Sequence, residues 1–331
     1  MAHKGVVLYS GGLDSLLAAK LLMEQGLDVT GFHCVLPFAP KDFVPEESYA
    51  ARLASQINLP LVYYICDREY IAMVRSPEHG RGKHINPCID CKIFFIKKAG
   101  EYMKKIGADF VATGEVVGQR PMSQMKNTMI HIAKETGLEG RLLRPLSALL
   151  LKPTLAEEQG VVNRAALLGI SGRGRKPQME LAAAWGIREY ASPAGGCLMT
   201  DANVSRRIED LFSHNGEVSA NAVRLTAFGR HFRINERTKL VVARNESEGI
   251  ELAKYADEAD ALFVPEFKGP AAILLGSLTD ETQSTAAAII SRYGSPSDND
   301  NKITVTAGGA PAGFILARQP ASEESLDAMR I

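Results

Sequence analysis

The chain has 331 residues, 46% hydrophobic and 23% charged, which suits two folded domains of ordinary composition. Lys plus Arg and Asp plus Glu both number 38, so the formal net charge is zero. Total charge therefore gives no argument for a nucleic-acid binder, which would need a local basic face. No apolar run is long enough for a membrane span, and the N-terminus lacks the apolar stretch of a secretion signal, so we expect a cytoplasmic protein.

The first half of the chain alternates short apolar runs with amphipathic ones. The pattern predicts strands over 5–9, 29–36, 61–65 and 110–112, and helices over 13–25, 46–56 and 89–106. Strands that alternate with helices predict an α/β fold, a parallel sheet with helices on both faces. Further helices are expected over 124–135, 154–168 and 179–185, and exposed loops over 114–124 and 169–177.

A change of composition near Asn215 predicts a domain boundary, with a first domain over 1–214 and a second over 215–331. The second segment contains two helical runs, 247–256 and 281–293, among several apolar runs. The expected strands are 232–234, 240–243, 261–264, 271–275, 303–306 and 314–317. This mixture predicts a smaller α+β domain of roughly a hundred residues.

A glycine-rich loop joins the first expected strand to the first expected helix. Two glycines let backbone N–H groups approach an anion, and the start of the helix presents its positive end to the same anion. The flanking serines can add hydroxyl donors, and the aspartate can hold Mg²⁺ or order the loop. A simple glycine turn with an Asp or Ser cap is the alternative. The loop consists of Ser10, Gly11, Gly12, Leu13, Asp14 and Ser15.

Five cysteines, an odd number without a secretion signal, argue against a disulfide framework. Cys88 and Cys91 open the helix expected over 89–106, and Cys197 lies in a tight turn expected over 192–197. Three thiolates suit a 4Fe-4S cluster with one open iron. A zinc knuckle, a redox dithiol pair or, for Cys197, a buried turn residue are the alternatives. The remaining two, Cys34 and Cys66, fall in apolar runs and are expected in the core.

The six-residue loop resembles the pyrophosphate loop (PP-loop) of the ATP pyrophosphatase superfamily, whose members cleave ATP between the α and β phosphates. The order of this loop, the Cys88/Cys91 pair and Cys197 is similar to that of the tRNA thiouridine synthases. The segments 112–124, with Thr-Gly-Glu-Val-Val-Gly-Gln, and 144–146, Arg-Pro-Leu, look like matching segments of the 4-thiouridine synthases. The Asn-Pro-Cys-x-x-Cys piece and the later Gly-Cys turn resemble the 2-thiouridine synthases too.

The resemblance covers about residues 4–213 and implies ATP-dependent thiolation of a tRNA uridine. A base oxygen would be adenylated with Mg²⁺ bound, and sulfur would then displace AMP. The sulfur donor would be a cysteine desulfurase or sulfide. Sulfur would pass either through a 4Fe-4S cluster bound by Cys88, Cys91 and Cys197, or through a persulfide on Cys197 with Cys91 as the resolving thiol. Zinc is the less favoured metal. Asp14 is the third catalytic candidate. The resemblance also implies that Gly114, Glu115 and Gln119 line the nucleotide pocket.

The 4-thiouridine synthases carry an RNA-binding module ahead of the phosphate loop, whereas this sequence begins almost at the loop. Residues 229–234, 241–245 and 265–271 resemble the NFACT-type RNA-binding domain; a dimerisation or capping domain is the alternative. Basic residues that could contact an RNA backbone are Arg173, Arg175, Lys176, Arg206 and Arg207.

Two other functions use the same features. The first alternative is an ATP-dependent ligase or amidotransferase that acts on a small molecule and uses the same loop. The second is a catalytically silent RNA-binding protein, which would release no pyrophosphate.

Overall fold

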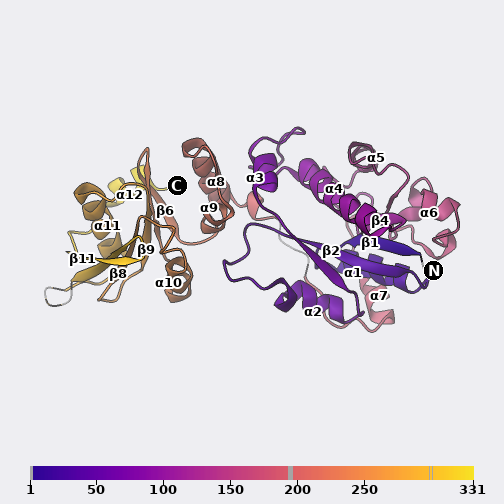
Figure 1. Ribbon diagram of the computed structural model, residues 1–331, viewed down its shortest axis with the longest axis horizontal. Coiled ribbons are helices and arrows are strands. Elements are labelled where there is room, and N and C mark those ends of the chain that lie inside the picture. The colour runs from indigo at the N-terminus through magenta and orange to yellow at the C-terminus, as the bar shows by residue number, and fades with distance from the viewer. Residues whose placement is uncertain (1–2, 193–196, 298, 300) are drawn as a thin grey trace. The chain divides into compact units, whose positions relative to one another are not determined.

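The computed structural model describes residues 3–192, 197–297, 299 and 301–331, and it divides into two compact units (Figure 1). The first unit consists of Met1–Leu36 and Asp42–Cys197, the second of Pro37–Lys41 and Leu198–Ile331. Within the described ranges, no helix combines the length and the apolar character needed to cross a membrane.

The first unit is built on a five-stranded parallel sheet of order β3-β2-β1-β4-β5. The predicted α/β class is thus confirmed. Strands β1 and β4 consist largely of buried apolar residues because helices cover both of their faces. The strands are β1 (Lys4–Leu8), β2 (Asp28–Val35), β3 (Leu61–Ile65), β4 (Phe110–Thr113) and β5 (Leu142–Leu143).

Two apolar clusters enclose this sheet. One packs α1 (Leu13–Met23) and α7 (Lys176–Ala184) against one face, and the other packs α4 (Cys88–Ile106) and α5 (Lys126–Glu135) against the opposite face. The remaining helices of the unit are α2 (Tyr49–Ser55), α3 (Arg68–Arg75) and α6 (Leu155–Glu158). Short 3-10 turns lie at Pro45–Glu47, Ala148–Leu150 and Arg164–Ala166.

The helix expected over 154–168 is wrong. Only the four-residue α6 and a separate 3-10 turn, Arg164–Ala166, form there. Asn163 Oδ1 accepts a hydrogen bond from the Ala165 backbone N–H, 3.1 Å away, and so starts the second turn independently. Asparagine competes in this way with a continuous helix because its side chain bonds nearby backbone.

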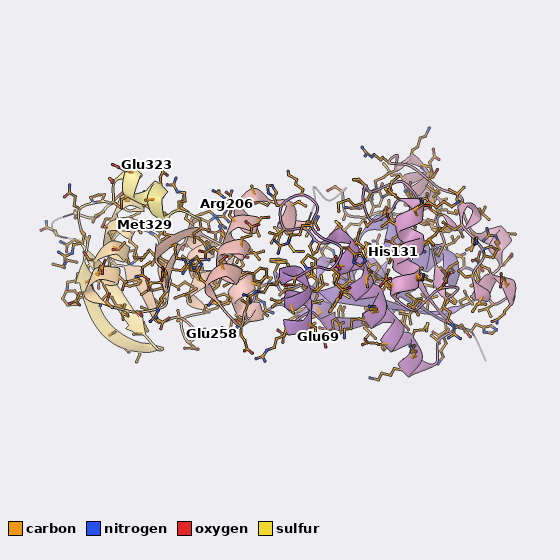
Figure 2. All side chains as sticks on the ribbon, turned by 90° about the horizontal axis from the view of Figure 1, so that it is seen from above. Glu69, His131, Arg206, Glu258, Glu323 and Met329 are labelled. Atoms are coloured by element: carbon orange, nitrogen blue, oxygen red, sulfur yellow. The ribbon has the colours of Figure 1, made fainter. Side chains whose placement is uncertain are left out.

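The second unit contains a six-stranded antiparallel sheet of order β11-β10-β8-β9-β7-β6. One apolar cluster packs α11 and α12 on one face, and another packs α9 and α10 on the other, so α10 and α11 lie on opposite sides (Figure 1). Figure 2 labels Glu323 and Met329 at the two ends of α12. The strands are β6 (Arg230–Asn235), β7 (Thr238–Val242), β8 (Ala261–Pro265), β9 (Ala272–Leu275), β10 (Lys302–Ala307) and β11 (Ala310–Leu316). The helices are α8 (Ala202–His214), α9 (Ala220–Leu225), α10 (Glu246–Ala253), α11 (Asp280–Tyr293) and α12 (Glu323–Met329), preceded by a 3-10 turn at Leu198–Thr200.

Helix α8 belongs to the second unit, although the sequence places the domain boundary after it, at 214/215. Asp210 of α8 accepts hydrogen bonds from Arg233 Nε (2.9 Å) and from Lys239 Nζ (3.1 Å), which lie on β6 and β7. Burial lowers the pKa of Lys239 to about 8, against the opposing effect of Asp210. These bonds join α8 to the second sheet.

Candidate functional site

The phosphate loop follows β1 and leads directly into α1. Gly11 has φ of +76°, a left-handed conformation that favours glycine. No side chain caps the helix at Gly12, and the first N–H groups of a helix have no acceptor within the helix. Ser15 Oγ donates to Gly12 O over 2.8 Å and accepts from Ser10 N over 3.2 Å. The loop is therefore closed on itself by its two serine hydroxyls, and the start of α1 that follows it is the kind of position where proteins bind anions.

Asp14 lies in the first turn of α1 and is held by a chain of amide side chains. Gln119 Nε2 donates to Asp14 Oδ2 over 2.7 Å, and Gln178 Nε2 donates to Gln119 Oε1 over 3.2 Å. The other carboxylate oxygen, Asp14 Oδ1, is buried without a hydrogen-bond partner in the described part of the chain. A free carboxylate oxygen beside a phosphate loop fits a Mg²⁺ ligand.

Gly114 packs against the start of α1. A Cβ atom there would lie 2.4 Å from Ser15 N and 2.6 Å from Asp14 O, so only glycine allows the strand end and the helix to approach this closely. This contact fixes the position of the helix that carries the phosphate loop. The expected place of Gly114 in the nucleotide pocket stays a prediction.

Glu115 is buried, with 2% of its surface exposed. Arg144 Nε donates to its Oε2 over 3.3 Å, Thr113 Oγ1 donates to the same oxygen over 3.1 Å, and Lys92 Nζ lies 3.6 Å from Oε1. Burial raises the pKa of Glu115, but Lys92 and Arg144 outweigh this effect and hold the pKa below its usual value. Glu115 thus ties the start of α4 to the end of β4, and its nucleotide contact remains a prediction.

Cys88 and Cys91 lie in the first turn of α4, as the sequence predicts. The Cys88 thiol donates to Asn86 Oδ1 over 3.2 Å, within its own loop. Cys91 Sγ lies 3.5 Å from the Tyr70 hydroxyl. Between them, buried Asp90 accepts hydrogen bonds from Glu78 N and His79 N over 3.1 Å each, and so attaches the preceding loop to the helix.

Cys197 lies near Cys91 and Tyr70. Its charge interaction contributes to raising the pKa values of both groups, and it belongs to the first unit. Burial is the main reason that the pKa of Cys91 rises to about 12. Part of the turn expected over 192–197, residues 193–196, lies outside the described residues.

A metal cluster shared by the three cysteines stays a prediction. In the described ranges, no group of three or more His, Cys, Asp and Glu side chains could hold a metal ion. Cys88 is bonded to Asn86, and Cys91 to Tyr70. The remaining cysteines, Cys34 and Cys66, interact with each other, which together with burial raises the pKa of Cys34.

The five predicted RNA-contacting residues are divided between the two units. Arg173, Arg175 and Lys176 lie at and before the start of α7, in the first unit, and Arg206 is exposed on α8. Arg207 is only 8% exposed and its Nη1 donates to Thr226 O over 3.0 Å. Arg207 therefore packs inside the second unit, in contrast to its expected place on an open basic surface.

Sequence reasoning missed three residues of this site, namely Tyr70, Asp90 and Gln178. Tyr70 lies on α3, where the apolar spacing of Tyr70, Ile71 and Val74 was an available helix signal, and its ring stacks on Phe95 with centroids 5.6 Å apart. Asp90 stands between the two cysteines, so its place at a helix start was the available signal. Gln178 gives no local signal.

Two family models match separate parts of the chain. Residues 3–137 match the family model described as the tRNA methyl transferase HUP domain. Residues 229–329 match the model described as the NFACT protein RNA binding domain. The resemblance of the first segment to the PP-loop superfamily, and of the second to the NFACT-type domain, is thereby confirmed.

Particular relatives point to one kind of tRNA-modifying enzyme. The chain is 35% identical over 113 residues to the tRNA-specific 2-thiouridylase MnmA of Desulfosudis oleivorans, covering 33% of this chain and 30% of that protein. It is 35% identical over 128 residues to the MnmA of Deinococcus radiodurans, covering 33% and 32%. The chain thus spans about a third of the length of these relatives.

One solved structure is similar to part of the chain. A crystal structure of a 4-thiouridine synthetase–RNA complex with bound ATP is 18% identical, with a TM-score of 0.35, and covers 56% of this chain and 52% of that one.

Proposed function

We propose that the protein catalyses ATP-dependent thiolation of a uridine in tRNA. The observation that carries this proposal is the placement of Cys91 and Cys197 near each other in the same unit as the phosphate loop. An ATP-dependent ligase needs the loop but has no use for two adjacent thiols. The similarity of the first unit to 2-thiouridylases supports the same choice.

The first step uses the phosphate loop. An oxygen of the uracil attacks the α-phosphorus of ATP, the bond to the β-phosphate breaks, and pyrophosphate leaves. The open N–H groups at the start of α1 stabilise the charge on the leaving group. Asp14 would hold Mg²⁺, which when bound neutralises part of the same charge.

The second step uses the two cysteines. A persulfide on Cys197, supplied by a persulfide-bearing donor protein such as a cysteine desulfurase, attacks the activated carbon through its outer sulfur and expels AMP. The Cys91 thiolate then attacks Cys197 Sγ, which breaks the S–S bond, leaves the sulfur on the base and forms a Cys91–Cys197 disulfide. An external dithiol reduces this disulfide by two electrons and restores both thiols. A 4Fe-4S cluster on Cys88, Cys91 and Cys197 is the competing route.

The assay is thiolation of unmodified tRNA by the purified chain with ATP, Mg²⁺ and a persulfide donor, followed by nucleoside mass spectrometry. We expect Cys197→Ser to abolish the product, because it removes the sulfur carrier. Cys91→Ser should stop at a base–S–S–Cys197 adduct that dithiothreitol releases. Cys88→Ser is the matched control and should retain activity under the dithiol route.

The alternatives predict different results. Loss of product in Cys88→Ser together with about four iron atoms per chain after anaerobic purification would favour the cluster. Full activity of Cys197→Ser would reject Cys197 as the sulfur carrier. Pyrophosphate release that needs a small acid or amine in place of tRNA would indicate a ligase.

A further inference from the structure

Part of the second sheet is open to solvent on one face. Helices α9 and α10 pack on the residues of β7 and β9 that point to this face. At the other end of the sheet, three apolar side chains on β8 and β11 remain exposed. They are Val264, 43% exposed, Phe314, 58% exposed, and Leu316, 48% exposed.

Strand register places these side chains on one surface. Thr304 of β10 pairs with Val264 on one side and with Phe314 on the other, so the three residues form a row across the strands. Lys302 pairs with Leu316, and Lys302 Nζ lies 5.1 Å from the centre of the Phe314 ring. The alternate residue Ile303 is buried against the opposite face. The open face is therefore defined by Val264, Lys302, Thr304, Phe314 and Leu316.

The chemistry of this face suits an unpaired nucleobase. An exposed aromatic ring on a strand offers a flat stacking surface, and a neighbouring cation can bind the backbone phosphate. Neighbouring strands are about 4.8 Å apart, so the three-strand row is about 10 Å wide, enough for one or two bases. A protein partner would be expected to need a larger apolar patch than these three side chains.

We propose that this open face binds unpaired bases of single-stranded RNA, with Phe314 as the stacking residue and Lys302 as the phosphate contact. The inference rests on the proposed function, since it supplies a contact for the tRNA substrate, and residues 229–329 match the NFACT RNA-binding model. The row lies wholly inside the second unit, so the binding it describes is separate from the chemistry at the phosphate loop.

The test is fluorescence anisotropy of a labelled ten-nucleotide oligouridylate with the full chain at low salt. We expect Phe314→Ala to weaken binding about tenfold, the scale of one lost base–aromatic stack, and Phe314→Trp to keep it. Lys302→Ala should weaken binding. It should also reduce the slope of log affinity against log salt concentration by about the amount that one phosphate contact contributes. Ile250→Ala is the matched control, because Ile250 is 63% exposed on α10, outside the row.

Wild-type affinity in Phe314→Ala would overturn the proposal. A change in sedimentation of Phe314→Ala without loss of oligonucleotide binding would also overturn it, in favour of a second copy of the chain as the occupant. The thiolation assay is independent of this result. If Phe314→Ala loses binding but the wild type makes no thiolated nucleoside, the proposed reaction fails while the RNA-binding face stands.

Discussion

The carboxylates beside the second sheet and the carboxylate beside the phosphate loop are bonded differently. In the second unit, both oxygens of Asp210 accept hydrogen bonds, from Arg233 and Lys239, and both oxygens of Glu248 accept bonds from Arg244 or the Gly229 backbone. In the first unit, Asp14 Oδ1 has no hydrogen-bond partner among the described residues. Paired carboxylates hold elements together, whereas a buried oxygen without a partner is expensive unless a ligand or an ion satisfies it.

The units also differ in where their candidate ligand surfaces lie. In the parallel sheet, the phosphate loop after β1 and the Gly114 segment after β4 meet at one edge, because the carboxyl ends of parallel neighbours point the same way. In the antiparallel sheet, the carboxyl ends of neighbouring strands point in opposite directions. The exposed side chains there lie instead on the part of a sheet face that the helices do not cover. A ligand site is thus set by topology in the first unit and by helix coverage in the second.

The largest expected effect concerns the Glu115–Arg144 pair, the counterpart in the first unit of Asp210–Arg233. Arg144→Met should lower the free energy of unfolding by about 3–5 kcal/mol, because it removes from the buried Glu115 carboxylate the cation that is hydrogen-bonded to it. The double variant Arg144→Met, Glu115→Leu should recover much of the loss. Urea denaturation followed by circular dichroism measures both; an equal loss in the two variants would contradict the pairing argument.

This pair also predicts a pH dependence. The pKa of Glu115 is lower in the folded protein than its ordinary value, so the folded state binds its proton less readily than the unfolded chain. Its stabilising effect is therefore complete above the unfolded pKa of about 4.3 and is lost as the pH falls through the lower, folded value. The wild type should lose stability over this acid range more steeply than the double variant, which lacks the carboxylate.

A smaller effect is expected at Gly114, which fixes the helix carrying the phosphate loop. Gly114→Ala should cost about 1–3 kcal/mol of stability, because its Cβ would overlap the α1 backbone. It should also weaken ATP binding by moving the loop. Gly174→Ala is the control, since no atom lies within 4 Å of a Cβ there. Isothermal titration with ATP would measure this affinity. If Gly114→Ala is destabilised but binds ATP as tightly as the wild type, the packing of Gly114 does not determine the position of the phosphate loop.

Much of the first unit could be predicted from sequence because its signals are local. Apolar strands, the glycine loop and the cysteines at a helix start each depend on a few adjacent residues, and β3 (Leu61–Ile65) was predicted with its observed bounds. The grouping of Cys197 with Cys91 came from the chemistry of three thiolates and from the resemblance, since no local pattern places two thiols that are distant in sequence.

The errors have physical causes that single-sequence patterns do not contain. Arg207 reads as a surface arginine, but its guanidinium finds the Thr226 carbonyl inside the second unit. Gly114 packs against the start of α1, a neighbour that the local sequence does not reveal, and its nucleotide contact stays a prediction. In both cases the deciding neighbour lies far along the chain, so only the fold reveals it.

The smallest effect concerns Pro37–Lys41, a segment that follows β2 of the first unit but belongs to the second. Lys41 Nζ lies 2.8 Å from Glu258 Oε1, donates to Lys254 O over 2.8 Å and lies 5.3 Å from the Tyr255 ring centre.

The ion pair of Lys41 with Glu258 is about one-third exposed, so solvent screens it. Lys41→Met should therefore lower the free energy of unfolding by only about 0.5–1 kcal/mol. Backbone hydrogen exchange over residues 37–41 should nevertheless become faster, because the variant loses the contacts of Lys41 and keeps the hydrogen bond from Arg224 Nε to Ala39 O. Lys20→Met, which removes a comparable exposed pair on α1, is the control and should leave this exchange unchanged. Equal exchange in all three proteins would show that Lys41 does not hold the segment.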